Sequence, residues 1–253
     1  MKRDDKNKEL IIELKDVSKH YHMGPNVVKA LDDLSIKIKK GNFVAIMGPS
    51  GSGKSTSMNI VGSLDIPTKG RIFLDGENIS YLSESDLAQI RGKKIGFIFQ
   101  SFNLIPNLTA KENIMMPMMF QGTDVEEREK KAEELLKLVH LENRTNHYPN
   151  ELSGGEMQRV AIARSLANDP EVILADEPTG NLDTKTGEIV LEFLEKLNKQ
   201  GKTIVMVTHD PELAKKHARI VYWLKDGKLE KITKKNHGWS NQSLEKLEKL
   251  KRG

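Results

Sequence analysis

Short apolar runs rich in β-branched residues recur along the chain and leave room for helices between them. The runs lie at 43–47, 95–99, 172–175, 203–207 and 219–224. Runs of this length without polar alternation are typical of strands buried on both faces of a sheet. In 188–199 the apolar residues fall on one helical stripe, as in a helix that covers a sheet. Strands that alternate with helices predict an α/β fold with a parallel sheet.

Two parts of the pattern depart from this alternation. Residues 10–40 and 71–81 show strand-like alternation and turn residues such as Asp75-Gly76, which predicts a smaller antiparallel sheet beside the main one. The interval of about 101–168 is mostly helical, and its best helix spans 125–140 with one apolar face. We therefore expect a parallel-sheet core, an antiparallel β subdomain and an inserted α-helical subdomain.

The charge of the chain is concentrated at its end. Residues 225–253 contain nine Lys or Arg and four Asp or Glu, whereas the net charge of the whole chain is only +4. The body lacks the basic patch of a nucleic-acid-binding domain, so no direct contact with nucleic acid is expected. We expect a polar tail at 1–9, a folded domain at 10–230 and a basic tail at 231–253. The apolar face of a short helix at 244–250 is narrow, which favours a solvated or loosely docked terminus over contact with lipid.

Composition indicates a reducing compartment and a substantial core. The 253 residues are enough for one large domain, and the absence of cysteine excludes disulfides and thiolate metal sites. The first residues lack the apolar stretch of a secretory signal, and no run approaches the roughly 18 apolar residues that span a bilayer. We expect a cytoplasmic location, with any membrane role depending on a partner.

A glycine-rich loop is the first candidate for chemistry. Residues 48–55 match G-x-x-x-x-G-K-S, follow the apolar run at 43–47 and precede a helix that begins near Ser55. Such a loop turns its backbone amides toward phosphate oxygens, and the helix adds its positive N-terminal end. Lys54 would bind the β- and γ-phosphates and Ser55 would hold Mg²⁺. An ordinary strand-to-helix turn is the disfavoured alternative, because both flanks and the Lys-Ser pair agree with the motif.

Two acids, Asp176 and Glu177, follow the apolar run at 172–175. A carboxylate at the end of a strand in an α/β sheet lies in the ligand crevice, so Asp176 can reach the metal held by Ser55. Glu177 is placed to take a proton from an attacking water or to orient it. The alternative for Glu177 is a solvated glutamate at the end of a strand. The pair favours hydrolysis over binding alone.

Other polar residues are ambiguous when taken alone. His209 follows an apolar run, but a lone histidine there is more often a structural hydrogen-bonding residue. Gln100 ends the run at 95–99 and fits either a metal contact or a plain strand end. Ser153 and Glu156 have the S-x-x-E spacing of a capping box, which leaves the glycine pair between them unexplained.

Together these features resemble the ATP-binding-cassette (ABC) ATPases over about 10–230. The matching elements follow the family's order: 48–55, Gln100, Leu-Ser-Gly-Gly-Glu at 152–156, Asp176-Glu177, Asn181-Leu-Asp183 and His209. The resemblance implies a P-loop NTPase fold with a RecA-like core. It also implies a head-to-tail homodimer that traps two ATP molecules, each between the phosphate loop of one subunit and the Leu-Ser-Gly-Gly helix of the other.

The same resemblance implies individual roles. Tyr21 would stack on adenine, the alternative being a surface tyrosine that packs on a strand. Gln100 would sense the metal and water, His209 would hold the γ-phosphate, and Asp183 would contact the opposing phosphate loop. The implied nucleotide-binding residues are Tyr21, Gly48, Pro49, Ser50, Gly51, Ser52, Gly53, Lys54, Ser55, Thr56, Ser153, Gly154, Gly155 and Asp183. The implied catalytic residues are Glu177, His209, Gln100 and Lys54, and the implied Mg²⁺ ligands are Ser55, Gln100 and Asp176.

Within the family, the phrases at 46–56, 95–106 and 176–183 resemble exporter-type cassettes of the MacB and LolD kind and the cell-division cassette FtsE. This implies an ATPase subunit of an export or extraction complex. A short helix of a separate permease would dock near Gln100, between the helical subdomain and the main sheet. The methionine-rich stretch at 115–120 lies there and suits either a docking surface or the subdomain core.

Two other functions stay open. One is a regulatory, FtsE-like cassette that signals through a membrane partner. The other is a non-transport ABC ATPase acting on nucleic acid or ribosomes, although such proteins usually carry long insertions that this sequence does not show. For the site itself, Ser153 is expected to cap its own helix in the nucleotide-free monomer and to turn to the γ-phosphate in a closed dimer.

Overall fold

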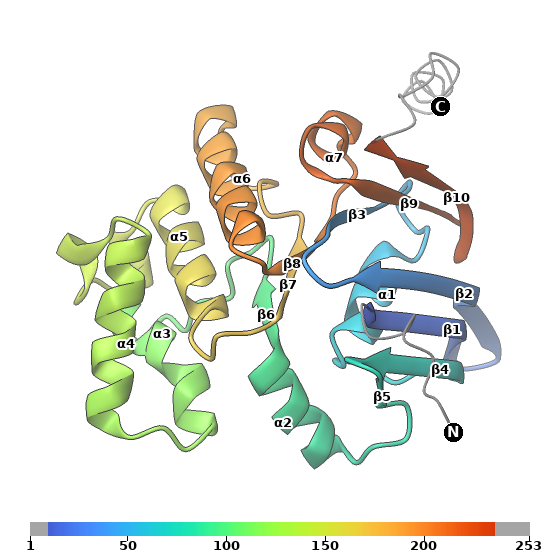
Figure 1. Cartoon of the computed structure of the whole chain (residues 1–253), viewed down its shortest axis with the longest axis horizontal. Helices are drawn as coiled ribbons and strands as arrows, with labels where there is room; N and C mark the ends of the chain where they lie inside the picture. The colour runs from blue at the N-terminus through green and yellow to red at the C-terminus, as the bar shows by residue number, and fades with distance from the viewer. Residues whose placement is uncertain (1–9, 236–253) are drawn as a thin grey trace.

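The computed structural model describes residues 10–235, so the predicted segments at 1–9 and 244–250 lie outside the described residues. A six-stranded sheet occupies the centre of the molecule (Figure 1). Its strands are β3 (Phe43–Met47), β6 (Ile95–Ile98), β7 (Val172–Asp176), β8 (Thr203–Val207), β9 (Ile220–Lys225) and β10 (Lys228–Lys234), in the order β10-β9-β3-β8-β7-β6. The five strands predicted from apolar runs are parallel to one another, and β10 adds an antiparallel edge that extends beyond residue 230.

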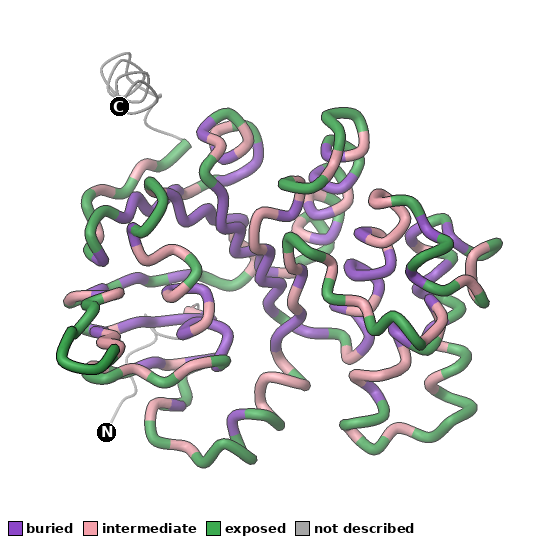
Figure 2. The backbone as a smooth tube through the Cα atoms, turned by 180° about the vertical axis from the view of Figure 1, so that it is seen from behind, coloured by how far each residue is buried: buried purple, intermediate pink, exposed green. Residues whose placement is uncertain are grey.

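The parallel strands are buried on both faces because their apolar residues are consecutive. In β3, Phe43, Ala45 and Met47 join one core cluster, whereas Val44 and Ile46 join the other. Strands β7 and β8 divide their side chains in the same way. Since successive side chains of a strand point to opposite faces, an uninterrupted apolar run is what a sheet covered on both sides requires. The buried backbone runs through the middle of the molecule (Figure 2).

A second, antiparallel sheet covers one face of the main sheet. It contains β1 (Leu10–Met23), β2 (Asn26–Lys39), β4 (Lys69–Leu74) and β5 (Glu77–Asn78), in the order β2-β1-β4-β5. Apolar side chains of this sheet pack with helices α1 (Lys54–Val61) and α2 (Glu84–Lys94) into the cluster that contains Val44 and Ile46. The antiparallel sheet predicted from 10–40 and 71–81 is therefore confirmed.

Helices cover the opposite face. They are α3 (Ala110–Phe120), α4 (Val125–Leu138), α5 (Gly154–Ser165), α6 (Thr184–Lys199) and α7 (Pro211–His217), with the 3-10 turns η2 (Glu142–Arg144) and η3 (Pro149–Glu151) between α4 and α5. Figure 1 shows α3, α4 and α5 gathered at the end of the molecule away from the antiparallel sheet. This arrangement confirms the predicted fold class. Between residues 10 and 235, no helix combines the length and the apolar character needed to cross a bilayer.

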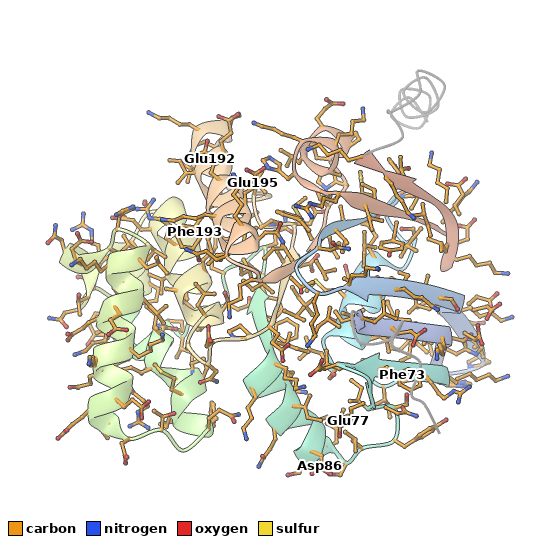
Figure 3. All side chains as sticks on the ribbon, viewed as in Figure 1. Phe73, Glu77, Asp86, Glu192, Phe193 and Glu195 are labelled. Carbon is orange, nitrogen blue, oxygen red and sulfur yellow. The ribbon has the colours of Figure 1, made fainter. Side chains whose placement is uncertain are left out.

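Helix α6 joins the helical group to α7. Phe193 and Glu195 lie on two sides of α6 (Figure 3). Glu195 Oε1 lies 2.7 Å from Nδ1 of His217, and the His217 ring stacks on Phe43 of β3 with ring centroids 6.5 Å apart. These contacts anchor α7, whose N-cap residue is Asp210, and they thereby fix the chain directly after His209.

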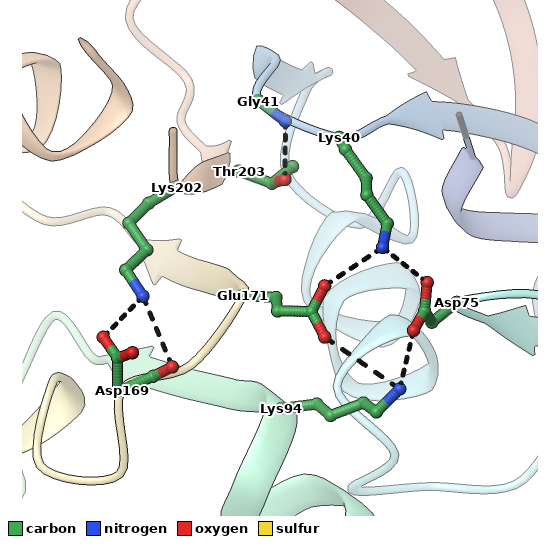
Figure 4. A network of polar contacts seen from close by, with 8 residues as sticks. All are labelled: Lys40, Gly41, Asp75, Lys94, Asp169, Glu171, Lys202 and Thr203. Carbon is green, nitrogen blue, oxygen red and sulfur yellow. Dashed lines mark hydrogen bonds and ion pairs between the residues drawn. The ribbon is translucent and has the colours of Figure 1, made fainter. Parts of the chain in front are cut away.

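A ring of four charged residues joins the two sheets at the N-terminal ends of the parallel strands (Figure 4). Lys40 Nζ lies 2.7 Å from Asp75 Oδ1 and 3.2 Å from Glu171 Oε2. Lys94 Nζ lies 2.9 Å from Asp75 Oδ2 and 4.0 Å from Glu171 Oε1. The hydrogen bond from Lys40, followed by the one from Lys94, holds the pKa of Asp75 below its usual range. Each carboxylate is therefore shared by two ammonium groups.

Replacing Asp75 with asparagine is expected to lower the free energy of unfolding by about 1 kcal/mol at pH 7, because two lysines lose a shared carboxylate. The pKa of Asp75 is lower in the folded chain than in the unfolded chain. Its contribution is therefore complete above about pH 4 and is lost as pH falls through the folded pKa. Urea unfolding of both proteins between pH 7 and pH 3 should show the difference shrinking below about pH 4.

Asp169→Asn is the matched control. Asp169 lies 2.7 Å from Lys202 and, like Asp75, has a positive φ that asparagine tolerates, but its side chain is 83% exposed whereas that of Asp75 is 31% exposed. An isolated exposed pair should contribute less than about 0.5 kcal/mol. Equal losses in the two variants would show that the ring in Figure 4 adds nothing to a single ion pair.

Candidate functional site

The loop between β3 and α1 carries the predicted phosphate-binding residues, and its outer side at 49–51 is exposed. A Cβ on Gly48 would lie 2.2 Å from the carbonyl oxygen of Leu224. Gly53 has φ +93°, and a Cβ there would lie 2.4 Å from the carbonyl oxygen of Ala30. Both positions require glycine. The loop is therefore packed against the protein at Gly48 and Gly53, whereas residues 49–51 are accessible to a ligand.

The polar side chains of the loop are arranged for an anion. Lys54 Nζ donates a hydrogen bond to the carbonyl oxygen of Pro49 at 2.8 Å. Burial lowers the pKa of Lys54, and the charges of Glu177 and Asp176 act in the opposite direction. The hydroxyl of Ser52 is buried and has no hydrogen-bond partner within the described part of the chain. A phosphate bound here could accept hydrogen bonds from both the Ser52 hydroxyl and the Lys54 ammonium.

The two acids lie at the end of β7, opposite the end of β8. Asp176 is in register with Val207, and the backbone amide of Glu177 donates to the carbonyl oxygen of Val207 at 2.9 Å. Burial raises the pKa of Asp176, Glu177 raises it further, and Lys54 lowers it. Glu177 has φ +45°, a left-handed conformation that is uncommon for glutamate and that tends to occur at functional sites.

His209 contacts Glu177 directly. Its Nδ1 lies 2.8 Å from Oε1 and 2.9 Å from Oε2 of the Glu177 carboxylate. The two residues follow the adjacent parallel strands β8 and β7, which explains how they meet across 32 residues of sequence. Because the His209 side chain is 73% exposed, its ring keeps access to a ligand while it holds the carboxylate.

Gln100 lies at the same edge of the sheet, two residues after the end of β6. Its carbonyl oxygen accepts a hydrogen bond from Asn181 Nδ2 at 2.9 Å. Its side chain covers Gly180 so closely that a Cβ there would lie 2.7 Å from Gln100 Nε2. The structure therefore brings Gln100 to the segment that follows Asp176 and Glu177.

Tyr21 lies near the end of β1, beside the phosphate loop. Its hydroxyl donates to Asp65 Oδ2 at 2.8 Å, and Thr56 is a second hydrogen-bond partner. Burial, followed by the contact with Asp65, raises the pKa of Tyr21. The ammonium of Lys19, which is paired with Asp65, lies 5.0 Å from the centroid of the Tyr21 ring. This placement agrees with both sequence interpretations, so adenine stacking stays a prediction.

Helix α5 begins with the predicted capping box. The Ser153 hydroxyl accepts from the amide of Glu156 at 3.3 Å, and the Glu156 carboxylate accepts from the amide of Ser153 at 2.8 Å. Arg144 Nε donates to the other Glu156 oxygen at 2.9 Å. Hydrogen bonds from Arg144 and from the Ser153 amide lower the pKa of Glu156 to about 2. The capping box is confirmed, with an arginine that the sequence did not indicate.

The two glycines of α5 have different surroundings. A Cβ on Gly155 would lie 2.5 Å from Thr186 Cγ2, so packing within the chain requires glycine there. A Cβ on Gly154 would meet no atom of residues 10–235 closer than 3.8 Å, so no contact within this part of the chain explains the glycine. Thr186 also donates its hydroxyl to Asp183, the N-cap residue of α6, at 2.6 Å. Residues 153–155 and Asp183 therefore lie at neighbouring helix starts.

The predicted site residues form two groups within one chain. Lys54, Asp176, Glu177 and His209 come together where β3, β7 and β8 end. The second group, 153–155, lies elsewhere, because α1 packs on β1, β2, β7 and β8 whereas α5 packs on α3, α4, α6 and β6 (Figure 1).

Two functional candidates on α5 escaped the sequence interpretation. Gln158 is fully buried and donates through Nε2 to the carbonyl oxygen of Pro178 at 2.7 Å. Arg164 donates to the carbonyl oxygens of Phe102 and Asn103. The available signal was that both polar residues lie close to the ends of the apolar run at 160–163, which indicates a hydrogen-bonding role near the core but does not identify the partner.

Ser55 and Asp176 offer oxygen donors of the kind that Mg²⁺ prefers. Within residues 10–235, no cluster of three or more His, Cys, Asp or Glu side chains could hold a metal ion. Mg²⁺ is commonly bound by one or two protein oxygens together with substrate phosphates. These residues therefore fit a magnesium ion that shares its coordination with a nucleotide.

A groove of about 600 Å³ lies between α2, β6, α3 and the end of α5. Aromatic and apolar side chains line much of it, among them Phe97, Phe99, Met116, Pro117 and Phe120, and its ionisable lining side chains are Arg91 and Arg164.

The residues of the stretch at 115–120 divide between the core and the groove. Met115 and Met118 pack with the core, whereas Met116 and Phe120 line the groove, and Phe120 is 75% exposed. The stretch therefore serves both as core and as exposed surface.

Comparisons with known proteins agree with this geometry. A family model described as "ABC transporter" matches residues 31–180. An ABC transporter ATP-binding protein of Thermotoga maritima is 53% identical over 225 residues, which cover 89% of this chain and 96% of that protein. The macrolide export ATP-binding/permease protein MacB of Brucella melitensis is 48% identical over 219 residues, which cover 87% of this chain but 34% of MacB. The dimeric post-hydrolysis structure of the ATP-binding cassette MJ0796 bound to ADP and Pi has a TM-score of 0.83 at 51% identity, covering 88% of this chain and 98% of that chain.

Glu156→Gln is expected to lower the free energy of unfolding by about 1 kcal/mol at pH 7, because glutamine still caps Ser153 but loses the charge that pairs with Arg144. The folded pKa of about 2 lies below the ordinary value of 4.5, so the carboxylate stabilises fully above pH 4.5 and loses its contribution as pH falls toward 2. Urea unfolding at several pH values should show a difference that is constant near neutrality and shrinks below pH 4.5.

Glu151→Gln provides the comparison, since Glu151 caps η3 through the backbone amide of Tyr148 at 2.8 Å. This change keeps an acceptor for the Tyr148 amide and should cost less stability than Glu156→Gln at pH 7. The same acid dependence in both variants would mean that Arg144 does not stabilise the Glu156 carboxylate.

Proposed function

The chain belongs to the ABC transporter family and is an ATP-binding, ATP-hydrolysing subunit, and we propose that as a homodimer it drives a separate membrane permease in export or extraction. The observation that carries the proposal is the Glu177–His209 pair beside Lys54 and Asp176, at the edge where three parallel strands end. A subunit of this kind works at the cytoplasmic face of the membrane, held there by the permease.

ATP binds with its phosphates over the exposed loop at 48–53 and the N-terminus of α1. Backbone amides and the positive end of the helix attract the phosphates, and Lys54 leaves the carbonyl of Pro49 to reach the β- and γ-phosphates. The orphan hydroxyl of Ser52 gains an acceptor. Tyr21, fixed by Asp65 and Thr56 beside the loop, stacks on the adenine.

Hydrolysis uses the acids at the end of β7. Glu177 accepts the proton of the attacking water, since phosphoryl transfer asks the protein mainly to position the water and stabilise charge. His209 orients the Glu177 carboxylate and turns its exposed ring toward the γ-phosphate. Ser55 and Asp176, with Gln100, would hold Mg²⁺, which supplies charge neutralisation to the phosphates when bound.

The second subunit completes each site with 153–155 of its α5. Three observations support this: α5 lies apart from α1 within one chain, no contact among the described residues requires glycine at 154, and the similar cassette MJ0796 is dimeric with ADP and Pi. The N-terminus of α5 then faces a phosphate, where its positive end is favourable. In this state the Ser153 hydroxyl leaves Glu156 and binds the γ-phosphate.

The permease docks in the groove lined by Phe99, Met116 and Phe120. Exposed apolar side chains that line a groove suit contact with an apolar face of another protein, and methionine adapts to irregular partners. The groove reaches Arg164 and Asn103, close to Gln100, so a docked helix would lie next to the hydrolysis site. The printed name of MacB joins an ATP-binding part and a permease part, and this chain matches about a third of it.

Glu177→Gln is expected to lower kcat for ATP hydrolysis by about 10²–10⁴-fold, because an amide cannot accept the proton. ATP binding should persist, and the variant should accumulate as an ATP-bound dimer. Phosphate release, nucleotide binding and size-exclusion chromatography with ATP measure these outcomes. Near-normal turnover would remove Glu177 from the role of base.

Two further variants serve as comparisons for Glu177→Gln. Lys54→Ala should lose ATP binding itself, so the two changes separate binding from chemistry. Glu212→Gln, on the exposed side of α7, makes the same change of carboxylate to amide three residues after His209 and should leave kcat unchanged.

Replacing Phe120 with serine is expected to reduce capture of an integral membrane protein by the tagged chain several-fold and to leave basal ATP hydrolysis unchanged, since Phe120 lies in the groove and not among the catalytic residues. Tyr81→Ser is the control, because Tyr81 is an equally exposed aromatic outside the groove (81% against 75%). Capture that survives Phe120→Ser, or that falls equally with Tyr81→Ser, would place the docking surface elsewhere.

A further inference from the structure

The loop that follows Gln100 contains two adjacent residues in the left-handed region of backbone space. Phe102 has φ +60° and Asn103 has φ +50°. A non-glycine residue is strained there, and two in succession persist only where the surroundings hold them. Within the loop, the amide of Asn103 donates to the carbonyl oxygen of Ser101 at 2.6 Å, which closes a tight turn. The loop needs a restraint from outside to stay in this conformation.

Arg164, in the last turn of α5, supplies that restraint. Its Nη2 donates to the carbonyl oxygen of Phe102 at 2.7 Å, and its Nη1 donates to that of Asn103 at 2.5 Å. The planar guanidinium can address both carbonyls at once, which a lysine ammonium cannot do with the same geometry.

The environment of Arg164 is electrostatically unfavourable. Burial lowers its pKa, and its two side-chain acceptors are neutral carbonyl oxygens rather than a carboxylate. A half-buried cation held in this way loses part of its hydration without the attraction of a carboxylate partner. Departures from ordinary packing rules of this kind concentrate at functional sites.

The residue that precedes this loop, Gln100, contacts the segment that follows Glu177. Asn181 donates to the carbonyl oxygen of Gln100, whose side chain covers Gly180. Helix α5 reaches this segment as well, because Gln158 donates to the carbonyl oxygen of Pro178. One helix therefore holds both the loop that carries Gln100 and the segment that follows Glu177.

We propose that Arg164 is a positioning residue for ATP hydrolysis, which holds the carbonyls of Phe102 and Asn103 so that Gln100 is presented to the nucleotide. The inference rests on the function proposed for Gln100 in the preceding section. Arg164 itself touches no nucleotide in this scheme, and its effect on turnover passes entirely through the loop at 101–103.

The test is a double-mutant cycle on the full chain with Arg164→Gln, Gln100→Ala and the combined variant. Arg164→Gln is expected to lower kcat by about 10- to 100-fold, as for a small misplacement of a positioned group. The KM for ATP should change by less than about threefold, because the phosphate loop and Tyr21, which supply most of the proposed contacts to ATP, keep their positions. The combined variant should be no slower than the slower single variant, since both changes remove the same function.

Two readouts separate positioning from loss of fold. In Arg164→Gln, hydrogen exchange at the amides of Phe102 and Asn103 should become faster, while the amides in the middle of α5 keep their protection. Arg164→Lys keeps the charge and can bond one carbonyl, so its kcat should lie between those of the wild type and Arg164→Gln. Arg128→Gln, on α4, is the matched control and should leave kcat unchanged.

The outcomes are distinct. If Gln100→Ala leaves kcat unchanged, the role proposed for Gln100 fails, and positioning by Arg164 fails with it. If Gln100→Ala lowers kcat and the two effects multiply in the combined variant, Gln100 keeps its role and only the inference on Arg164 is overturned. Wild-type kcat in Arg164→Gln would overturn it as well. Should Arg164→Gln not fold, the same cycle is run with Arg164→Lys.

Discussion

The parallel pairing of β3, β8 and β7 determines where the reactive side chains lie. Val207 of β8 is in register both with Ile46 of β3 and with Asp176 of β7. The residues that follow these three positions therefore emerge at the same edge of the sheet: the phosphate loop, Glu177 and His209. A shift of one residue in either pairing would turn the apolar side chains of a strand to the wrong face, so the hydrophobic core enforces the register that assembles the site.

The parallel strands were predictable because their apolar runs have no polar interruption, and the phosphate loop and the acid pair were predictable because each directly follows such a run. Strand β10 was not predicted, since its residues alternate between exposed and half-buried positions at a lysine-rich edge. The partners of Tyr21 and Glu156 also escaped prediction. Asp65 lies 44 residues from Tyr21, and Arg144 reaches Glu156 only because η2 folds back against α5.

The glycine pair at the start of α5 shows how the structure refines a motif. Sequence alone treats Gly154 and Gly155 as equivalent, but Thr186 requires glycine at 155, whereas no neighbour in the described part of the chain requires it at 154. The capping box then contributes a second property. Arg144 and the Ser153 amide hold the Glu156 carboxylate ionised, so in the closed dimer that we propose the helix start would stay formed after the Ser153 hydroxyl turns to the phosphate.

Helix α5 is the element that connects the separate parts of this site. Its first residue after the cap, Gly154, lies at the surface assigned to the second subunit, its middle holds Pro178 through Gln158, and its end holds the Gln100 loop through Arg164. Arg164 also lines the groove assigned to the permease. A helix moves as a nearly rigid body. A partner that displaces α5 at either end therefore also shifts the hydrogen bonds that Gln158 and Arg164 make. In the function proposed here, one helix thereby couples the permease, the catalytic edge and the dimer surface, without a long chain of intermediate side chains.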